Sequence, residues 1–158
     1  MKNAICVLDK HGHVTFKQCC KHHSVTVEFI LNNFLSESIH AIHIHEYGDT
    51  MDGCKSLGGH FNPLNVTHGS FLIDENPRHA GDLINNFKAD KNGSFQFQYE
   101  DESITLFGED SILGRSVVIH EGRDDLGLGK GDKRKESLIS GNAGKRIVCG
   151  VIGLKANN

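Results

Sequence analysis

The stretch SVTVEFIL, residues 24–31, decides the fold class of this 158-residue chain. Apolar side chains occupy every second position from Val25 to Leu31, and Thr26 and Glu28 stand between them. Side chains two positions apart on an extended strand point to the same side of a sheet. The stretch therefore predicts a β-strand that buries one face and exposes the other.

Seven more short segments with alternating character lie on either side of this stretch, separated by turn residues. They are residues 3–9, 14–19, 40–46, 82–89, 94–99, 115–121 and 146–154. KHGH (residues 10–13) and CKHH (residues 20–23) are predicted turns, and DKNG (residues 90–93) is a strong hairpin signal. Helical periodicity is weak throughout. We therefore predict an all-β domain over residues 1–158, an eight-stranded antiparallel sandwich or barrel.

Charge and composition argue against several classes of protein. The formal net charge of -3 gives no indication of a nucleic-acid or acidic-membrane partner. Apolar runs stop short of membrane-spanning length, and the N-terminal residues turn polar too early for a signal peptide. We therefore expect a cytoplasmic protein. Its 5 cysteines, an odd number, leave at least one thiol outside any internal disulfide, and the cytoplasm keeps thiols reduced by default.

Two long segments, residues 47–81 and 122–145, are rich in glycine and show little strand pattern. Long loops inside a compact domain are uncommon and are usually functional. Ordering each residue costs about 1–2 kcal/mol of backbone entropy. We therefore expect specific interactions to hold both segments in place.

Histidines concentrate on one predicted strand, in HAIHIHE, residues 40–46. His43 and His45 would share a face there, where two neutral imidazoles can clamp a metal ion; two histidines on a solvated face are the alternative. Further candidate ligands are His60, His68, His79, Asp82 and His120. A mixed His/Asp set suits zinc, an imidazole-rich set also suits copper, and the lack of a CxxC pair excludes a zinc finger. The histidines at positions 11, 13, 22 and 23 are expected to lie in turns without a role.

Five sequence blocks give the chain a resemblance to the copper/zinc superoxide dismutases. They are HIHEYGD, GGHFNP, RHAGDL, VVIHEGRDDLGLG and GNAGKRIVCGVIG, and they occur in the family's order with similar spacing over nearly the whole chain. The resemblance implies an immunoglobulin-like Greek-key sandwich or barrel with two long functional loops. It also implies an enzyme that converts superoxide radical anion into dioxygen and hydrogen peroxide, in antioxidant defence.

The resemblance further implies one copper ion and one zinc ion per subunit. Copper would be held by His43, His45, His60 and His120. Zinc would be held by His60, His68, His79 and Asp82. His60 would belong to both sets, since an imidazolate has one ring nitrogen for each metal.

The same resemblance gives roles to three supporting residues. Asp124 would accept hydrogen bonds from the outer ring nitrogens of His43 and His68, fixing their tautomers. His40 would pack inside the sandwich. Arg146 would stand at the mouth of the copper channel and dock superoxide. A surface arginine at the start of a strand is the alternative.

A disulfide between Cys54 and Cys149 is also implied by the resemblance, and it would tie the first long segment to the last strand. Cys6, Cys19 and Cys20 would remain as free thiols. Cys6 alternates with apolar neighbours and is expected in the core. Adjacent residues on a strand face opposite sides, so one of Cys19 and Cys20 is expected to be exposed.

Basic side chains cluster in residues 130–146, which hold six basic and two acidic residues. This local charge of +4 within a chain of -3 leaves -7 elsewhere, and such a field can focus an anion on one mouth of a protein. A solvated charged loop is the alternative for residues 133–135. Ile139 departs from the family's pattern, which has a polar or basic side chain there.

Two alternatives to the enzyme stay open. The first is a catalytically silent relative that binds copper and zinc, such as a copper carrier or a chaperone-like domain. The second is a structural or interaction sandwich that uses zinc as a staple. The family is typically homodimeric, so a homodimer with CGVIGL (residues 149–154) at its interface is implied, and a copper chaperone is a potential partner.

Overall fold

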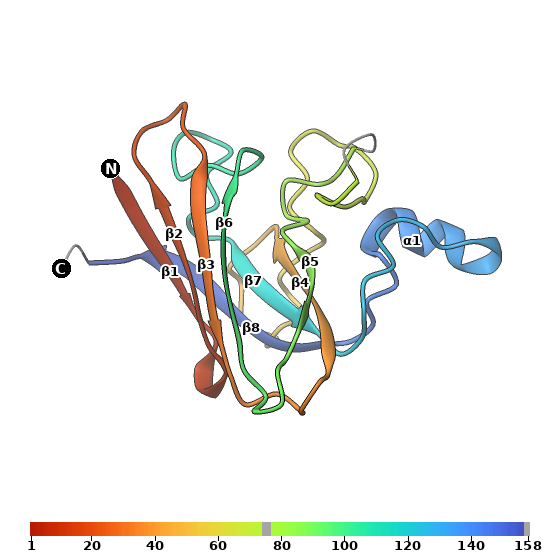
Figure 1. The fold of residues 1–158 in the computed structure, drawn as a ribbon. Helices are drawn as coiled ribbons and strands as arrows, with labels where there is room; N and C mark the ends of the chain where they lie inside the picture. Colours follow the sequence, from red (N-terminus) through yellow and green to blue (C-terminus); the bar gives the residue numbers. More distant parts are fainter. Residues whose placement is uncertain (74–76, 157–158) are drawn as a thin grey trace.

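The computed structural model describes residues 1–73 and 77–156, and its architecture is built from eight strands (Figure 1). The strands are β1 (Lys2–Val7), β2 (Gly12–Gln18), β3 (Val25–Leu31), β4 (Ile39–His45), β5 (Asn85–Lys88), β6 (Phe95–Asp101), β7 (Ser116–His120) and β8 (Arg146–Leu154). Each of the eight predicted strands is confirmed, with boundaries shifted by a few residues at most.

Hydrogen bonding joins all eight strands in the order β5-β4-β7-β8-β1-β2-β3-β6, and every pairing is antiparallel. Strand β8 spans the two halves, because Val151 pairs with Ser116 of β7 while Ile152 pairs with Cys6 of β1. Strands β5 and β6 are left at the two edges. The predicted fold class is confirmed as a nearly closed Greek-key barrel.

The core forms from the alternating faces of these strands. On β3 the inward residues Val25, Val27, Phe29 and Leu31 are at most 2% exposed. Burying each such side chain contributes about 1.5–3 kcal/mol. A register slip of one residue would place Thr26 and Glu28 in the core. The alternation therefore fixes the register of β3 between β2 and β6.

The hairpin between β5 and β6 uses the predicted DKNG turn. Asp90 accepts hydrogen bonds from the backbone of Asn92 and Ser94 through Oδ1. Gly93 has a φ of 75°, and a Cβ there would lie 2.2 Å from the carbonyl oxygen of Phe34. This position therefore requires glycine.

Three predictions about local structure were wrong. The second long segment contains a 3-10 helix, η2 (Gly131–Lys133), and a helix, α1 (Arg134–Ser140), where no helix was expected. His13 lies within β2 and not in a turn. Cys19 and Cys20 are both exposed, because β2 ends at residue 18 and the alternation of a strand does not reach them.

Both long segments lie beside β4 and β7 (Figure 1). A disulfide joins Cys54 of the first segment to Cys149 of β8. The backbone N–H of His68 donates to the carbonyl of Leu138 at 2.9 Å and so connects the first segment to α1. Cys6 is buried in the core, as predicted. None of the described helices is both long and apolar enough to cross a membrane.

Candidate metal centre

Seven buried side chains converge between β4, β7 and the two long segments. They form two groups that share one histidine: His43, His45, His60 and His120, then His60, His68, His79 and Asp82. Each of the seven residues is at most 8% exposed. Within each group the candidate ligand atoms all lie within 4.8 Å of one another. The structure thus brings together the residues singled out in the sequence.

The second group has the dimensions of a tetrahedral zinc site. Asp82 Oδ1 lies 2.9 Å from Nδ1 of His60, 3.0 Å from Nδ1 of His68 and 3.3 Å from Nδ1 of His79. Nδ1 of His79 lies 3.4 Å from Nδ1 of His60. Zinc–ligand bonds of about 2.0–2.1 Å give a tetrahedron with edges of about 3.3–3.4 Å. One carboxylate and three imidazoles at these spacings fit zinc.

The first group consists of imidazole nitrogens only. Nε2 of His45 lies 3.3 Å from Nε2 of His120. Counting partners in the described part of the chain, His43 Nδ1 and His60 Nε2 are buried without a hydrogen bond, and so is His68 Nδ1 in the second group. An unpartnered buried polar atom costs about 1–3 kcal/mol. Bound ions would satisfy these atoms, and four imidazoles suit copper.

Five of the six imidazoles donate their outer ring nitrogen to a fixed oxygen. The pairs are His43 to Asp124 Oδ2, His68 to Asp124 Oδ1, His45 to the Gly58 carbonyl, His120 to the Gly144 carbonyl and His79 to the Val66 carbonyl. Each of these hydrogen bonds orients a ring so that its second nitrogen points toward the group, where it can bind a metal in the neutral state.

His60 differs from the other five imidazoles. Its Nδ1 faces Asp82 and its Nε2 has no partner. Within residues 1–73 and 77–156 neither of its ring nitrogens has an acceptor outside the two groups. Both nitrogens are therefore available as ligands, one to each group.

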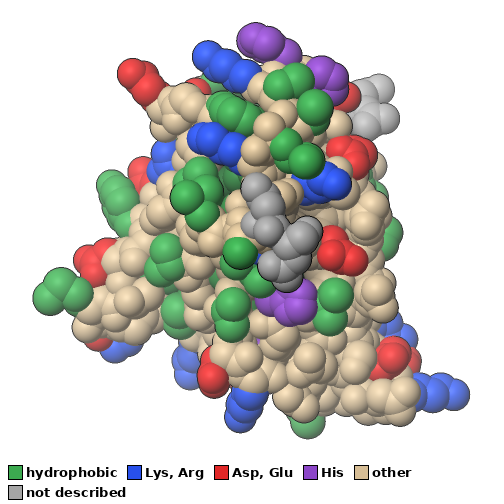
Figure 2. Space-filling model, turned by 90° about the vertical axis from the view of Figure 1, so that its left-hand side faces the viewer, with side chains coloured by type: hydrophobic (Ala, Val, Ile, Leu, Met, Phe, Trp, Pro, Cys, Tyr) green, Lys and Arg blue, Asp and Glu red, His purple; other side chains and the backbone are tan. Residues whose placement is uncertain are grey.

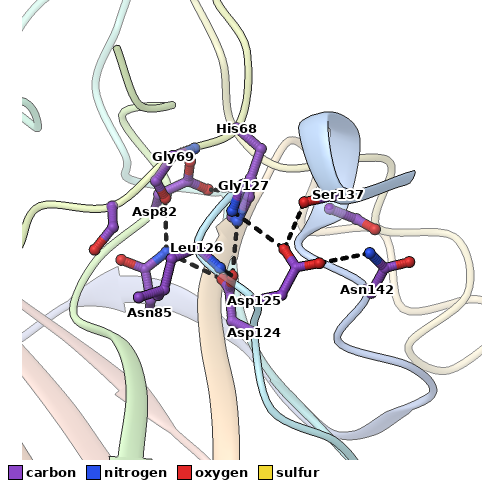
Figure 3. A network of polar contacts seen from close by, with 12 residues as sticks. His68, Gly69, Asp82, Asn85, Asp124, Asp125, Leu126, Gly127, Ser137 and Asn142 are labelled. Carbon is purple, nitrogen blue, oxygen red and sulfur yellow. Dashed lines mark hydrogen bonds and ion pairs between the residues drawn. The ribbon is translucent and has the colours of Figure 1, made fainter. Parts of the chain in front are cut away.

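Asp124 connects the two groups, and Figure 3 shows its place beside His68 and Asn85. Its carboxylate is buried and accepts from Nε2 of His43 at 2.7 Å and from Nε2 of His68 at 2.8 Å. The Asn85 side chain donates to Oδ2 at 3.0 Å. Asn86 holds the Asp124 backbone on both sides, through Oδ1 to the N–H and through Nδ2 to the carbonyl. The carboxylate is therefore held in one orientation.

Three of these neighbours were missed from the sequence. Asn85 and Asn86 interrupt the apolar pattern of β5, and this interruption was the available signal in the sequence. In the structure Asn85 is buried with a positive φ of 57°. Gly141 ends α1 with a φ of 68°, and a Cβ there would lie 2.2 Å from Asp124 Oδ1 and 2.6 Å from His68 Nε2. That close approach gives no signal in the sequence beyond the glycine itself.

Burial sets the protonation of most of the imidazoles. Desolvation lowers the pKa of His43 to about 3 and the pKa of His120 to about 4. Burial also lowers the pKa of His68, but the hydrogen bond to Asp124 and the close carboxylate of Asp82 outweigh it and raise this pKa to about 9. The first group is therefore neutral at pH 7 and ready to bind a metal, whereas His68 must release a proton to do so.

Metal-free protein is expected to lose stability as the pH falls from 7 to 5. Unfolded imidazoles take up protons near pH 6.5, whereas folded His43 and His120 stay neutral down to about pH 3–4. Their stabilising contribution is present above pH 6.5 and is lost below it. The slope is at most about 1.4 kcal/mol per pH unit for each histidine.

The raised pKa of His68 acts in the opposite direction, because its contribution is complete below pH 6.5 and is lost as the pH rises through about 9. Urea unfolding of metal-free protein at several pH values measures the combined effect of these histidines on the free energy of unfolding. His120→Asn should reduce the slope between pH 7 and 5 by the share of one histidine. Equal midpoints at pH 7 and pH 5 would contradict the prediction.

Arg146 begins β8 next to the first group. Its guanidinium donates to the carbonyl of Cys54 at 2.8 Å and to the carbonyl of Gly58 at 2.5 Å. The same Gly58 oxygen accepts from His45. Arg146 and Lys145 line an open depression of about 700 Å³ together with residues 52–55. A fixed cation thus borders a surface opening beside the first group.

His40 lies at the outer end of β4, half-buried between the rings of Phe34 and Phe87. Its Nδ1 lies 2.9 Å from the carbonyl oxygen of His120 and its Nε2 lies 3.0 Å from Ser38 Oγ. The ring is outside both groups and contacts the backbone of one of their members.

Comparison with known proteins gives one consistent set of matches. The family described as copper/zinc superoxide dismutase (SODC) matches residues 10–152. Superoxide dismutase [Cu-Zn] of Onchocerca volvulus is 45% identical over 98% of this chain and 97% of that relative. The enzyme of that name from Saccharomyces cerevisiae is 48% identical over 90% of this chain and 89% of the relative. An extracellular superoxide dismutase [Cu-Zn] of Brugia pahangi is 48% identical over 77% of this chain and 60% of the relative.

Proposed function

The chain belongs to the copper/zinc superoxide dismutase family, and on that premise we propose which of its residues carry the reaction. The protein is an enzyme that converts two superoxide anions and two protons into dioxygen and hydrogen peroxide. We assign copper to His43, His45, His60 and His120, and zinc to His60, His68, His79 and Asp82. The chain acts as one domain that holds one ion of each kind.

One observation carries this assignment. Five imidazoles donate outward to fixed oxygens, and the sixth, His60, lies between the two groups with both nitrogens free to bind. The tetrahedral spacing around Asp82 Oδ1 assigns zinc to one side of His60. The all-imidazole set then takes copper on the other side.

Copper, when bound, supplies the one-electron couple that takes an electron from one superoxide and gives it to the next. The protein supplies the proton path and the docking site. His60 Nε2 has no hydrogen-bond partner among the described residues, so it can carry a proton whenever it does not bind a metal. His60 Nδ1 remains engaged on the zinc side and keeps the ring in place.

Arg146 is the docking residue in this proposal. Its guanidinium is held by three carbonyl oxygens at the opening next to the copper group, where it can attract a small anion. Arg146→Ala should lower kcat/KM about 10- to 100-fold, since a hydrogen bond to a charged group contributes about 1.5–3 kcal/mol. Superoxide decay at equal copper content is the measurement.

Two further variants make the Arg146 result interpretable. Arg146→Lys keeps the charge and should recover part of the loss. Lys145→Ala removes a neighbouring charge from the same depression and should have a smaller effect. If Arg146→Ala changed copper content and left the rate per copper intact, the docking role would be wrong.

The function as a whole is tested by superoxide decay with protein of known copper and zinc content at several ionic strengths. The decay rate is expected to rise in proportion to bound copper. Full copper occupancy without activity would leave a silent copper carrier instead. Slower decay with added salt would support focusing of the anion by the six basic side chains of residues 130–146.

A homodimer is the proposed assembly. Val7 is 59% exposed and Val151 is 41% exposed. They stand at the next facing positions of β1 and β8 after the pair of Cys6 and Ile152. Sedimentation of the purified protein tests the dimer.

The cellular location is left open by the names of the relatives, because one of them is extracellular. We propose a cytoplasmic location and copper delivery by a chaperone.

A further inference from the structure

The turn between β2 and β3 carries four metal-ligand side chains within five residues, in CCKHH, residues 19–23. Cys19, Cys20, His22 and His23 are all exposed. Figure 2 shows histidine side chains gathered at the upper end of the molecule, the end at which β2 and β3 join in Figure 1. Short tracts rich in cysteine and histidine are typical of metal binding. Neither the interior metal groups nor the docking site uses this turn.

Two of these donors are already in contact. Cys20 Sγ lies 2.9 Å from Nδ1 of His23. Cys19 is the preceding residue, and its thiol is exposed as well. The turn therefore presents one thiol and one imidazole in contact on the surface, with a second thiol next to them in the chain.

The backbone of this turn is held from inside the barrel. The N–H of His23 donates to the carbonyl of Cys20 at 3.1 Å. The Gln18 side chain is 1% exposed; its Nε2 donates to the His23 carbonyl at 2.7 Å and its Oε1 accepts from the N–H of Leu106 at 2.7 Å. A turn fixed in this way loses little conformational freedom when its side chains bind a ligand.

We propose that Cys19, Cys20 and His23 form a third metal site, which takes a soft monovalent copper ion. Thiolate ligands select Cu(I) over harder ions, and imidazole is compatible with it. Zinc almost always takes four ligands in a structural site, whereas the two thiols and one imidazole of this proposal supply three. The ion replaces the protons of both thiols.

Charges around the turn are balanced. His22 and His23 line an open depression of about 830 Å³, in which the carboxylates of Glu102 and Asp110 offset the cations of Lys21 and Arg78. Desolvation and the neighbouring Cys19 thiol raise the pKa of Cys20, so the ion must displace a proton. Binding should therefore release protons into the solution.

The test adds Cu(I) to full-length protein whose interior sites are already loaded with copper and zinc, in competition with a colorimetric Cu(I) chelator. We expect one further equivalent to be retained, with thiolate-to-copper absorption in the ultraviolet. The double variant Cys19→Ser/Cys20→Ser should lose this equivalent. His23→Asn should hold it less tightly, and Cys6→Ser, which changes the buried thiol, should retain it.

Three results would overturn this site: retention of the extra equivalent by the double variant, its loss in Cys6→Ser, or binding of added Zn²⁺ but not Cu(I) at the turn. Dismutase activity is measured in parallel and should be the same in the double variant and the wild type, since both cysteines lie outside the proposed active site. Failure of the third site is thereby distinguished from failure of the proposed active site.

Discussion

Replacing Asp124 by asparagine is expected to weaken zinc binding by about 10- to 100-fold, the usual effect of losing a carboxylate behind a metal-bound histidine. The carboxylate accepts from His43 and His68 with one oxygen each. An asparagine amide has one accepting oxygen and one donating NH₂ group. One imidazole would then face a donor, and its proton would have to move to the nitrogen that binds the metal.

Chelator competition for zinc and copper in Asp124→Asn measures this effect. Asp125→Asn is the matched control, because Asp125 accepts from Ser137 and Asn142 and contacts neither of the two imidazoles (Figure 3). Its zinc affinity should change much less. Equal losses in the two variants would mean that Asp124 acts only by ordering the segment.

Removing the disulfide is expected to have the largest effect on stability. Cys54 and Cys149 are 95 residues apart, and the chain-entropy model gives about 4.7 kcal/mol for a closed loop of about 100 residues. Cys149→Ser should lower the free energy of unfolding of metal-free protein by about that amount. Urea unfolding monitored by circular dichroism provides the measurement.

A free cysteine provides the control for the Cys149 variant. Cys19→Ser changes an exposed thiol and should shift the free energy of unfolding by no more than about 0.5 kcal/mol. Activity of Cys149→Ser should also fall, since the carbonyl of Cys54 is one of the three oxygens that hold Arg146. Unchanged stability in Cys149→Ser would show that the unfolded chain is already compact.

Strand positions could be predicted because alternation is a local property. Strand β3 buries every second side chain from Val25 to Leu31, and the eight-residue stretch 24–31 alone shows this alternation. Helix α1 was missed because it has seven residues and buries only Ser137, which leaves no apolar stripe. A helix that short is unstable alone. Asp125 and Ser137 hold it through a side-chain hydrogen bond of 2.7 Å that local pattern does not reveal.

The candidate site likewise contains residues that local spacing could predict and residues that only the folded structure reveals. His43 and His45 could be paired from their spacing on one strand, but the ligand sets as a whole came from the resemblance to a family. Asn86 and Gly141 were not predicted, because both act on Asp124 through contacts made by the fold. The Asn86 side chain forms hydrogen bonds with the Asp124 backbone, and Gly141, which lacks a side chain, leaves room for the carboxylate.

The position of Asp124 between His43 and His68 has a thermodynamic consequence for the order in which the protein takes up its two metal ions. A metal that fixes His68 also fixes the carboxylate that orients His43, so occupancy of either pocket prepares the other. Linkage makes this coupling reciprocal: zinc must raise the affinity for copper by the same factor by which copper raises the affinity for zinc. When metal is scarce, molecules should therefore be either empty or doubly loaded more often than independent pockets would allow.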